Sequence, residues 1–175
     1  ACMAGADAVM LSGETAVGRY PVEAVAAMDA ILREAEAYQF FTNGGLFRPS
    51  PPERRHDVLD AMGVSVAQLS RDLQVRAIFA LTRSGTTARI ISSDRPAAPV
   101  MALTQSKETA RRMALLWGVY PFRVRRDLDM TEFVRQGEAI VKRLRLGKRG
   151  DYLLLLSGLG TRNASTNTVV VHRVG

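Results

Sequence analysis

Four hydroxylated residues, an arginine and a glycine follow an apolar stretch in the run Thr82-Arg83-Ser84-Gly85-Thr86-Thr87. Hydroxyl groups, a guanidinium and the free backbone N–H groups at a helix start are suitable ligands for a phosphate. A second polar loop, within residues 157–168, has the same character and contains Gly160, Thr161, Arg162, Ser165 and Thr166. We expect the first loop to hold a phosphate and the second to cover the rest of its ligand.

Helix capping explains part of the first loop equally well. Ser84, Thr86 and Thr87 are residue types that satisfy the free N–H groups at a helix start. Neither the P-loop pattern Gly-x-x-x-x-Gly-Lys-Ser/Thr nor the dinucleotide pattern Gly-x-Gly-x-x-Gly occurs in the sequence. The residue pattern therefore leaves capping and phosphate binding as open alternatives.

The remaining candidates for chemistry are few. His56 and His172 are the only histidines, and neither has a cysteine or carboxylate at metal-ligand spacing. We expect His172 to lie on a solvated face of the last strand. Asp127 and Asp129 could bind a metal, but their position in a loop after two arginines favours a solvated turn. From the residues we predict no catalytic group and no metal site.

Charge divides the chain into two parts. The net charge is +7, but residues 1–47 carry two basic and six acidic side chains, whereas residues 48–175 carry 22 and 11. A basic second part predicts an anionic partner. We do not expect nucleic acid, because no recognition helix or aromatic stacking platform accompanies the basic residues. A single cysteine, no signal-peptide pattern and no long apolar run predict a cytoplasmic protein with no membrane partner.

Apolar periodicity predicts the elements that position these residues. The first part is expected to contain a strand over 7–12 and a helix over 22–37, followed by a Pro/Gly-rich linker over 48–54. Alternating elements follow: helices over 57–72, 87–93, 107–117 and 131–144, and strands over 75–81, 99–104, 118–124, 151–157 and 168–174. We expect 118–124 at a sheet edge because of Pro121, and 151–157 at the centre because it is the most apolar strand.

This order predicts an α/β fold. The sheet should be open, mostly parallel and doubly wound, with one antiparallel C-terminal strand, since the last loop is too short for a crossover helix. In such sheets ligands bind at the carboxyl ends of the strands, where both polar loops would lie.

Several segments resemble one known family. The run Gly5–Val25, "GADAVMLSGETAVGRYPVEAV", closely resembles the end of the (β/α)8 barrel of pyruvate kinases. The segments "LTRSGTTAR", "WGVYPFRV", "KRGDYLLLLSG" and "STNTVVV" follow in the order of that family's C-terminal domain. The resemblance implies that residues 1–47 are the last β/α part of a barrel, 48–54 a linker, and 55–175 the C-terminal effector-binding and interface domain.

The resemblance also implies a reaction. Pyruvate kinases transfer the phosphoryl group of phosphoenolpyruvate to ADP in glycolysis, with Mg²⁺ and K⁺ in the full enzyme. The family's catalytic lysine and Mg²⁺ ligands belong to earlier barrel strands, and their motifs do not occur in residues 1–175. We therefore expect no cofactor and no catalysis in this chain alone. Ser12 and Glu14 would support the wall of the active site.

The family's C-terminal domain implies regulation instead. The phosphate loop of the effector site matches residues 82–87, so a phosphorylated sugar or nucleotide monophosphate is the expected ligand. Ala164 stands where members commonly have glycine, which leaves the choice of effector open. A homo-oligomer, tetrameric in the full enzyme, is the expected assembly. The alternative is a free-standing regulatory or binding module of the same fold.

Overall fold

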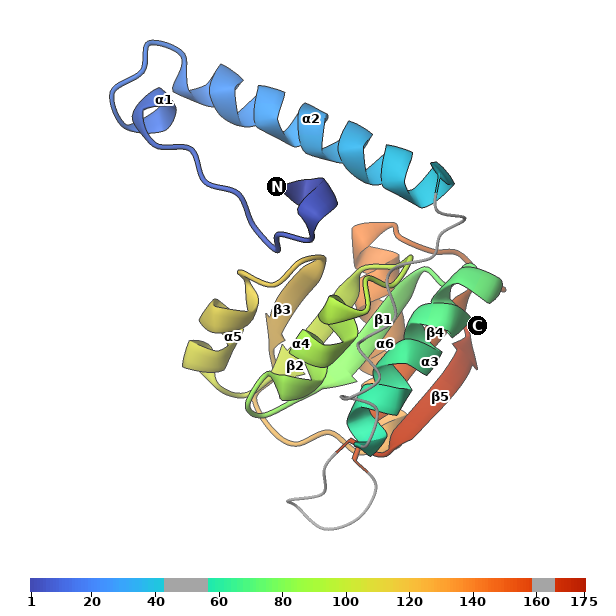
Figure 1. The fold of residues 1–175 in the computed structure, drawn as a ribbon. Helices are drawn as coiled ribbons and strands as arrows, with labels where there is room; N and C mark the ends of the chain where they lie inside the picture. Colours follow the sequence, from blue (N-terminus) through green and yellow to red (C-terminus); the bar gives the residue numbers. More distant parts are fainter. Residues whose placement is uncertain (43–56, 159–165) are drawn as a thin grey trace. The chain divides into compact units, whose positions relative to one another are not determined.

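The computed structural model describes residues 1–42, 57–158 and 166–175. The chain divides into two compact units, Ala1–Leu46 and Phe47–Gly175, and each is described by itself (Figure 1). Among the described residues, no helix combines the length and the apolar character needed to cross a membrane. The predicted linker at 48–54 lies outside the described residues.

The first unit is helical. It contains a short 3-10 helix, η1 (Cys2–Ala4), one turn of helix, α1 (Gly13–Ala16), and a long helix, α2 (Pro21–Thr42). The predicted helix is confirmed and is longer than expected; it begins at Pro21, whose fixed φ suits the first helical turn. The predicted strand at 7–12 is wrong, because these residues have no regular structure. A strand needs a neighbour for its backbone hydrogen bonds, and the described part of this unit offers none.

A five-stranded sheet forms the centre of the second unit, in the order β3-β2-β1-β4-β5. Its strands are β1 (Ala77–Leu81), β2 (Val100–Thr104), β3 (Val119–Arg123), β4 (Tyr152–Ser157) and β5 (Thr168–Arg173). Its helices are α3 (Val58–Asp72), α4 (Thr86–Ser93), α5 (Lys107–Met113) and α6 (Met130–Leu144). The first four strands pair in parallel and β5 runs antiparallel to β4, as predicted. The predicted fold class is confirmed.

Two apolar layers cover the faces of this sheet. Val66, Ile91 and Met113, from α3, α4 and α5, pack on one face. Phe133 and Ile140 of α6 pack on the other, so α6 lies behind the sheet in Figure 1. Alternate residues of each strand point to opposite layers, as the two-residue period of a strand requires.

One prediction about strand positions in the sheet is confirmed and another is wrong. Pro121 lies on β3 at the sheet edge, as predicted, where a missing N–H costs no ladder bond. The most apolar strand, β4, is not the central one, since β1 occupies the middle. Leu153–Leu156 are nevertheless fully buried, because β5 covers the outer edge of β4 while helices cover both faces.

The helix expected over 107–117 ends early, at Met113. Turns follow, and Gly118 adopts a positive φ of 63°. The carbonyl of Trp117 accepts a hydrogen bond from the Ser92 hydroxyl at 2.7 Å. This contact with α4 ties residue 117 to the neighbouring helix in place of a further turn of α5.

Candidate functional site at the switch point of the sheet

The order of the strands creates a switch point between β1 and β4. From β1 the chain moves outward through α4, β2, α5 and β3, and then returns over the opposite face through α6 to β4. The carboxyl ends of β1 and β4 are therefore neighbours, with Ala80 beside Leu156. A crevice opens where neighbouring crossovers depart to opposite faces, and this is where open α/β sheets bind ligands.

Both predicted loops begin at this point and meet there. Thr87 Oγ1 and Thr166 Oγ1 are 2.7 Å apart in a buried hydrogen bond that joins residues 79 positions apart in sequence. Gly160, Thr161, Arg162 and Ser165, the other residues predicted for the second loop, lie outside the described residues. Thr166 is thus the described residue through which the second loop contacts the first.

The first loop makes a left-handed turn into α4. Gly85 is the N-cap residue, with φ of 90°, and its N–H donates to Thr82 Oγ1 at 3.1 Å. A side chain at this position would be strained, and its Cβ would lie 3.1 Å from Met113 Cγ. Glycine is therefore required both by the turn and by the approach of α5.

Capping accounts for only part of the hydroxyl groups of this loop. No side chain caps α4, and Thr86 and Thr87 lie inside the helix rather than at its cap. Ser84 Oγ lies 2.9 Å from Thr86 Oγ1, and its contact with the Thr86 N–H is long, at 3.4 Å. The hydroxyls of the loop are thus bonded to one another, to backbone N–H groups or to Thr166, and they lie next to the positive end of the α4 dipole.

Arg83 has an acidic neighbour from another loop. Its guanidinium Nη2 lies 3.7 Å from Asp127 Oδ1, and both side chains are mostly exposed. Gln105 Nε2 also donates to Asp127 Oδ1, at 2.7 Å. Three loops at the carboxyl edge of the sheet thus converge on Asp127, and a phosphate that binds Arg83 must compete with this carboxylate.

The two loop aspartates both make contacts within the fold. Asp129 is the N-cap of α6 and accepts from the Glu132 N–H at 2.8 Å. The described residues contain no group of three or more histidine, cysteine or carboxylate side chains that could hold a metal. Asp127 is also mostly exposed, which agrees with the expected solvated turn.

One polar group at the switch point was not predicted as a site residue. Ser157, at the carboxyl end of β4, has a buried hydroxyl with no hydrogen-bond partner among the described residues. A buried hydroxyl without a partner costs about 1–3 kcal/mol. The only signal in the sequence is a serine that ends an otherwise apolar strand.

His172 was expected on a solvated face of β5, but the structure shows it partly buried and paired with Glu138. Its Nε2 lies 2.8 Å from Glu138 Oε1 of α6, and only a quarter of its side chain is exposed. This hydrogen bond, together with one from the Gly175 N–H, lowers the pKa of Glu138 to about 2. The pair joins β5 to α6 and lies in neither polar loop.

In the first unit, Ser12 and Glu14 contact each other. The Ser12 N–H donates to Glu14 Oε2 at 3.0 Å, next to the first turn of α1. Hydrogen bonds from the backbone N–H groups of Glu14 and Ser12 lower the pKa of the Glu14 carboxyl below its usual value. Glu14 thus accepts a hydrogen bond from the backbone at the start of α1.

The comparisons with known proteins point in one direction. The family model described as "Pyruvate kinase, alpha/beta domain" matches residues 60–172. Pyruvate kinases of Staphylococcus epidermidis, Staphylococcus saprophyticus and Sporosarcina psychrophila are 40%, 38% and 36% identical to the chain over 174, 173 and 173 residues. Each alignment covers 98% of this chain and 29% of the relative, so the chain spans less than a third of their length.

The matched domain contains the observed sheet and the switch-point loop that follows β1. Sequence identity of this level over nearly the whole chain implies a common fold as well as common ancestry. The recognition from short motifs is therefore confirmed: the chain belongs to the pyruvate kinase family and corresponds to its C-terminal part, which includes the alpha/beta domain.

Proposed function

We propose that this chain senses a phosphorylated small molecule on behalf of a pyruvate kinase. The whole enzyme would transfer the phosphoryl group of phosphoenolpyruvate to ADP, with Mg²⁺ and K⁺. The observation that carries the proposal is the buried Thr87–Thr166 hydrogen bond, which brings two polar loops together at the switch point of the sheet. A ligand at this point would touch segments that are far apart in the sequence.

The geometry suits a phosphate monoester. The N–H groups at the start of α4 and the hydroxyls of Ser84 and Thr86 would donate to its oxygens, with support from the helix dipole. Arg83 would turn from Asp127 to the phosphate and bind two oxygens at once. Release of Asp127 would alter the loop that leads into α6, so ligand binding would reach a second element of the fold.

Calorimetry with a panel of sugar phosphates and nucleotide monophosphates tests this proposal. We expect millimolar or tighter binding of at least one member, and loss of that binding on combining Arg83→Ala with Thr86→Ala. Arg111→Ala is the matched control, because Arg111 is an exposed arginine on α5 outside the loop. Absence of heat with every ligand, or unchanged binding by the double variant, would contradict the proposal.

The same proposal includes subunit contacts. β5 lies at the end of the sheet, and Val171 on it is 47% exposed. An open edge strand with an exposed apolar side chain can pair with another copy of the chain. We therefore propose self-association through this edge.

Catalysis itself is proposed for the whole enzyme only. Ser12 and Glu14 would support one wall of the active site, since the Ser12 N–H holds the Glu14 carboxylate in place. Phosphoryl transfer depends on metals, a lysine and arginines that neutralise charge.

A further inference from the structure

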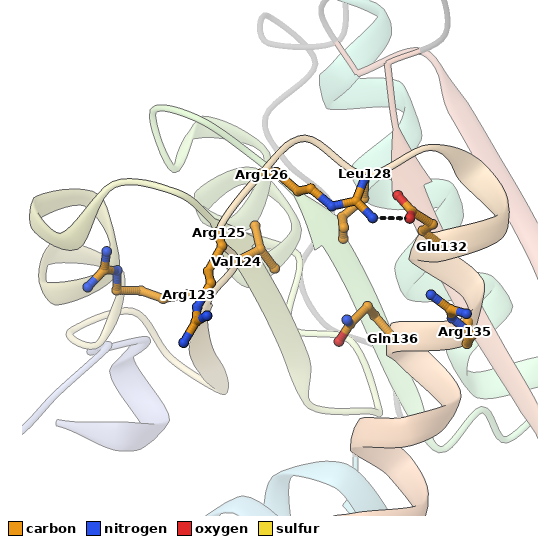
Figure 2. A pocket seen from close by; sticks show the side chains of 8 residues that line it. All are labelled: Arg123, Val124, Arg125, Arg126, Leu128, Glu132, Arg135 and Gln136. Carbon is orange, nitrogen blue, oxygen red and sulfur yellow. Dashed lines mark hydrogen bonds and ion pairs between the residues drawn. The ribbon is translucent and has the colours of Figure 1, made fainter.

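A cleft of about 310 Å³ lies between the end of β3 and the start of α6. Four arginines line it: Arg123, Arg125 and Arg126 from the β3 side, and Arg135 from α6 (Figure 2). Glu132 is the only acidic residue in the lining. The sequence places the first three arginines together, but Arg135 joins them only because the chain turns back into α6.

The positive charge of this cleft is poorly balanced within the protein. Arg126 forms an ion pair with Glu132, as the dashed line in Figure 2 shows. Within the described ranges, no ion pair involves the other three arginines, Arg123, Arg125 and Arg135. With four arginines and one glutamate, the lining carries a net charge of +3. Unbalanced positive charge in the lining of a concave site attracts an anion.

The cleft is separate from the switch-point site. Asp127 lies in the same loop, between the lining residues Arg126 and Leu128, but it does not line the cleft. Its carboxylate contacts Arg83 and Gln105 instead, on the side of the β1 and β2 loops. A negative charge therefore stands at the border of the two basic sites, and an anion in the cleft need not touch residues 82–87.

The size and lining of the cleft limit its ligand. Small-molecule sites span about 300–1,000 Å³, so this cleft is at the lower end of that range. Val124 and Leu128 contribute an apolar part, and Gln136 a neutral polar one. A single phosphate would contact only some of the arginines, which come from both sides of the cleft.

We propose that this cleft binds a small multivalent anion, with two or more phosphate or carboxylate groups, as a site independent of the switch-point loops. Arg125 and Arg135 would approach the ligand from opposite sides with forked, charge-assisted hydrogen bonds. Arg126 remains paired with Glu132, so Glu132 competes with the ligand for this guanidinium. Removal of that carboxylate should strengthen binding.

Calorimetric titration of the full 175-residue chain with inorganic pyrophosphate at low ionic strength tests the site. We expect Arg125→Gln combined with Arg135→Gln to raise the Kd at least tenfold, and Glu132→Gln to lower it about threefold. The matched control removes two exposed arginines outside the cleft, Arg111→Gln with Arg143→Gln, and should change the Kd less than twofold. A parallel titration with citrate separates carboxylate from phosphate ligands.

The outcomes separate this site from its alternatives. Combining Arg83→Ala with Thr86→Ala should leave pyrophosphate binding unchanged; its loss would assign the anion to the switch-point loops and overturn the proposal. An equal effect of the control pair would show general charge attraction, which also overturns it. An absence of binding to both pyrophosphate and citrate would also overturn the proposal. This holds even if the chain binds RNA or an acidic peptide instead. Circular dichroism of each variant confirms that it is folded.

Discussion

At the scale of single residues, Glu138 accepts hydrogen bonds from three groups. Its Oε1 accepts from the Gly175 N–H at 3.1 Å and hydrogen-bonds His172 Nε2, and Lys142 Nζ donates to its Oε2 at 3.2 Å. These groups come from β5, the segment after it and α6 itself. Because they favour the carboxylate, the pKa of Glu138 falls from 4.5 to about 2.

This shift predicts a dependence of stability on pH. A folded-state pKa below the unfolded value contributes stability above pH ~4.5, and that contribution is lost as the pH falls towards 2. We expect Glu138→Gln to lower the free energy of unfolding at pH 7 and to flatten its decline between pH 4.5 and 2. Urea unfolding across this range measures both effects.

Glu108→Gln is the control, because Glu108 is an exposed residue of α5 whose side chain is 80% accessible. Its removal should shift the whole curve little and leave the slope unchanged. Equal slopes for the native chain and Glu138→Gln would show that Glu138 does not carry the acid dependence.

At the scale of elements, side-chain caps fix the starts of three helices. Asp57, Ser106 and Asp129 each accept a hydrogen bond from a backbone N–H in the first turn of α3, α5 or α6. Apolar periodicity placed the starts of these helices within one residue of the observed ones. The strand predicted at 7–12 was wrong because strand formation depends on a neighbour, which a local pattern does not reveal.

Two glycines inside helices provide an element-scale prediction. A Cβ at Gly63 of α3 would lie 2.4 Å from Asp94 Oδ2 and 3.0 Å from Ile90 Cγ2, at the contact with α4. We expect Gly63→Ala to destabilise the fold by about 1–3 kcal/mol, although alanine is the better helix former. Thermal unfolding of the purified variant measures the loss.

Gly137 of α6 is the matched control. A Cβ there would meet the ring of Phe79 at 3.5 Å, which is an ordinary van der Waals contact. Gly137→Ala should therefore be neutral or stabilise by about 0.5–1 kcal/mol through helix propensity. If both substitutions changed the unfolding temperature alike, close packing between α3 and α4 would not be the reason that Gly63 is a glycine.

At the scale of the whole molecule, the second unit leaves the β5 edge of its sheet open. If copies associate through this edge, a charge there should weaken the contact, because edge charges oppose strand pairing. We expect the chain to self-associate in sedimentation velocity, and Val171→Lys to shift it towards the monomer. Val58→Lys is the control, since Val58 is an exposed valine at the start of α3. A monomeric native chain, or equal shifts in both variants, would count against association through β5.

Local patterns in the sequence were sufficient to predict four features: the family, the alternation of helices and strands, the antiparallel last strand and the edge position of β3. Each depends on interactions within a few residues: apolar period, caps, a proline, or a loop too short for a helix. They also predicted a polar loop before α4, although not its left-handed turn at Gly85.

Only the tertiary structure decided which distant residues meet. The Thr87–Thr166 hydrogen bond, the convergence of Arg83 and Gln105 on Asp127, the pairing of His172 with Glu138 and the addition of Arg135 to the arginine cleft all join separate elements. These contacts follow from strand order, which is set by how the two faces of the sheet are buried. Burial is a property of the whole fold, so residue spacing along the chain could name the reactive groups but not their partners.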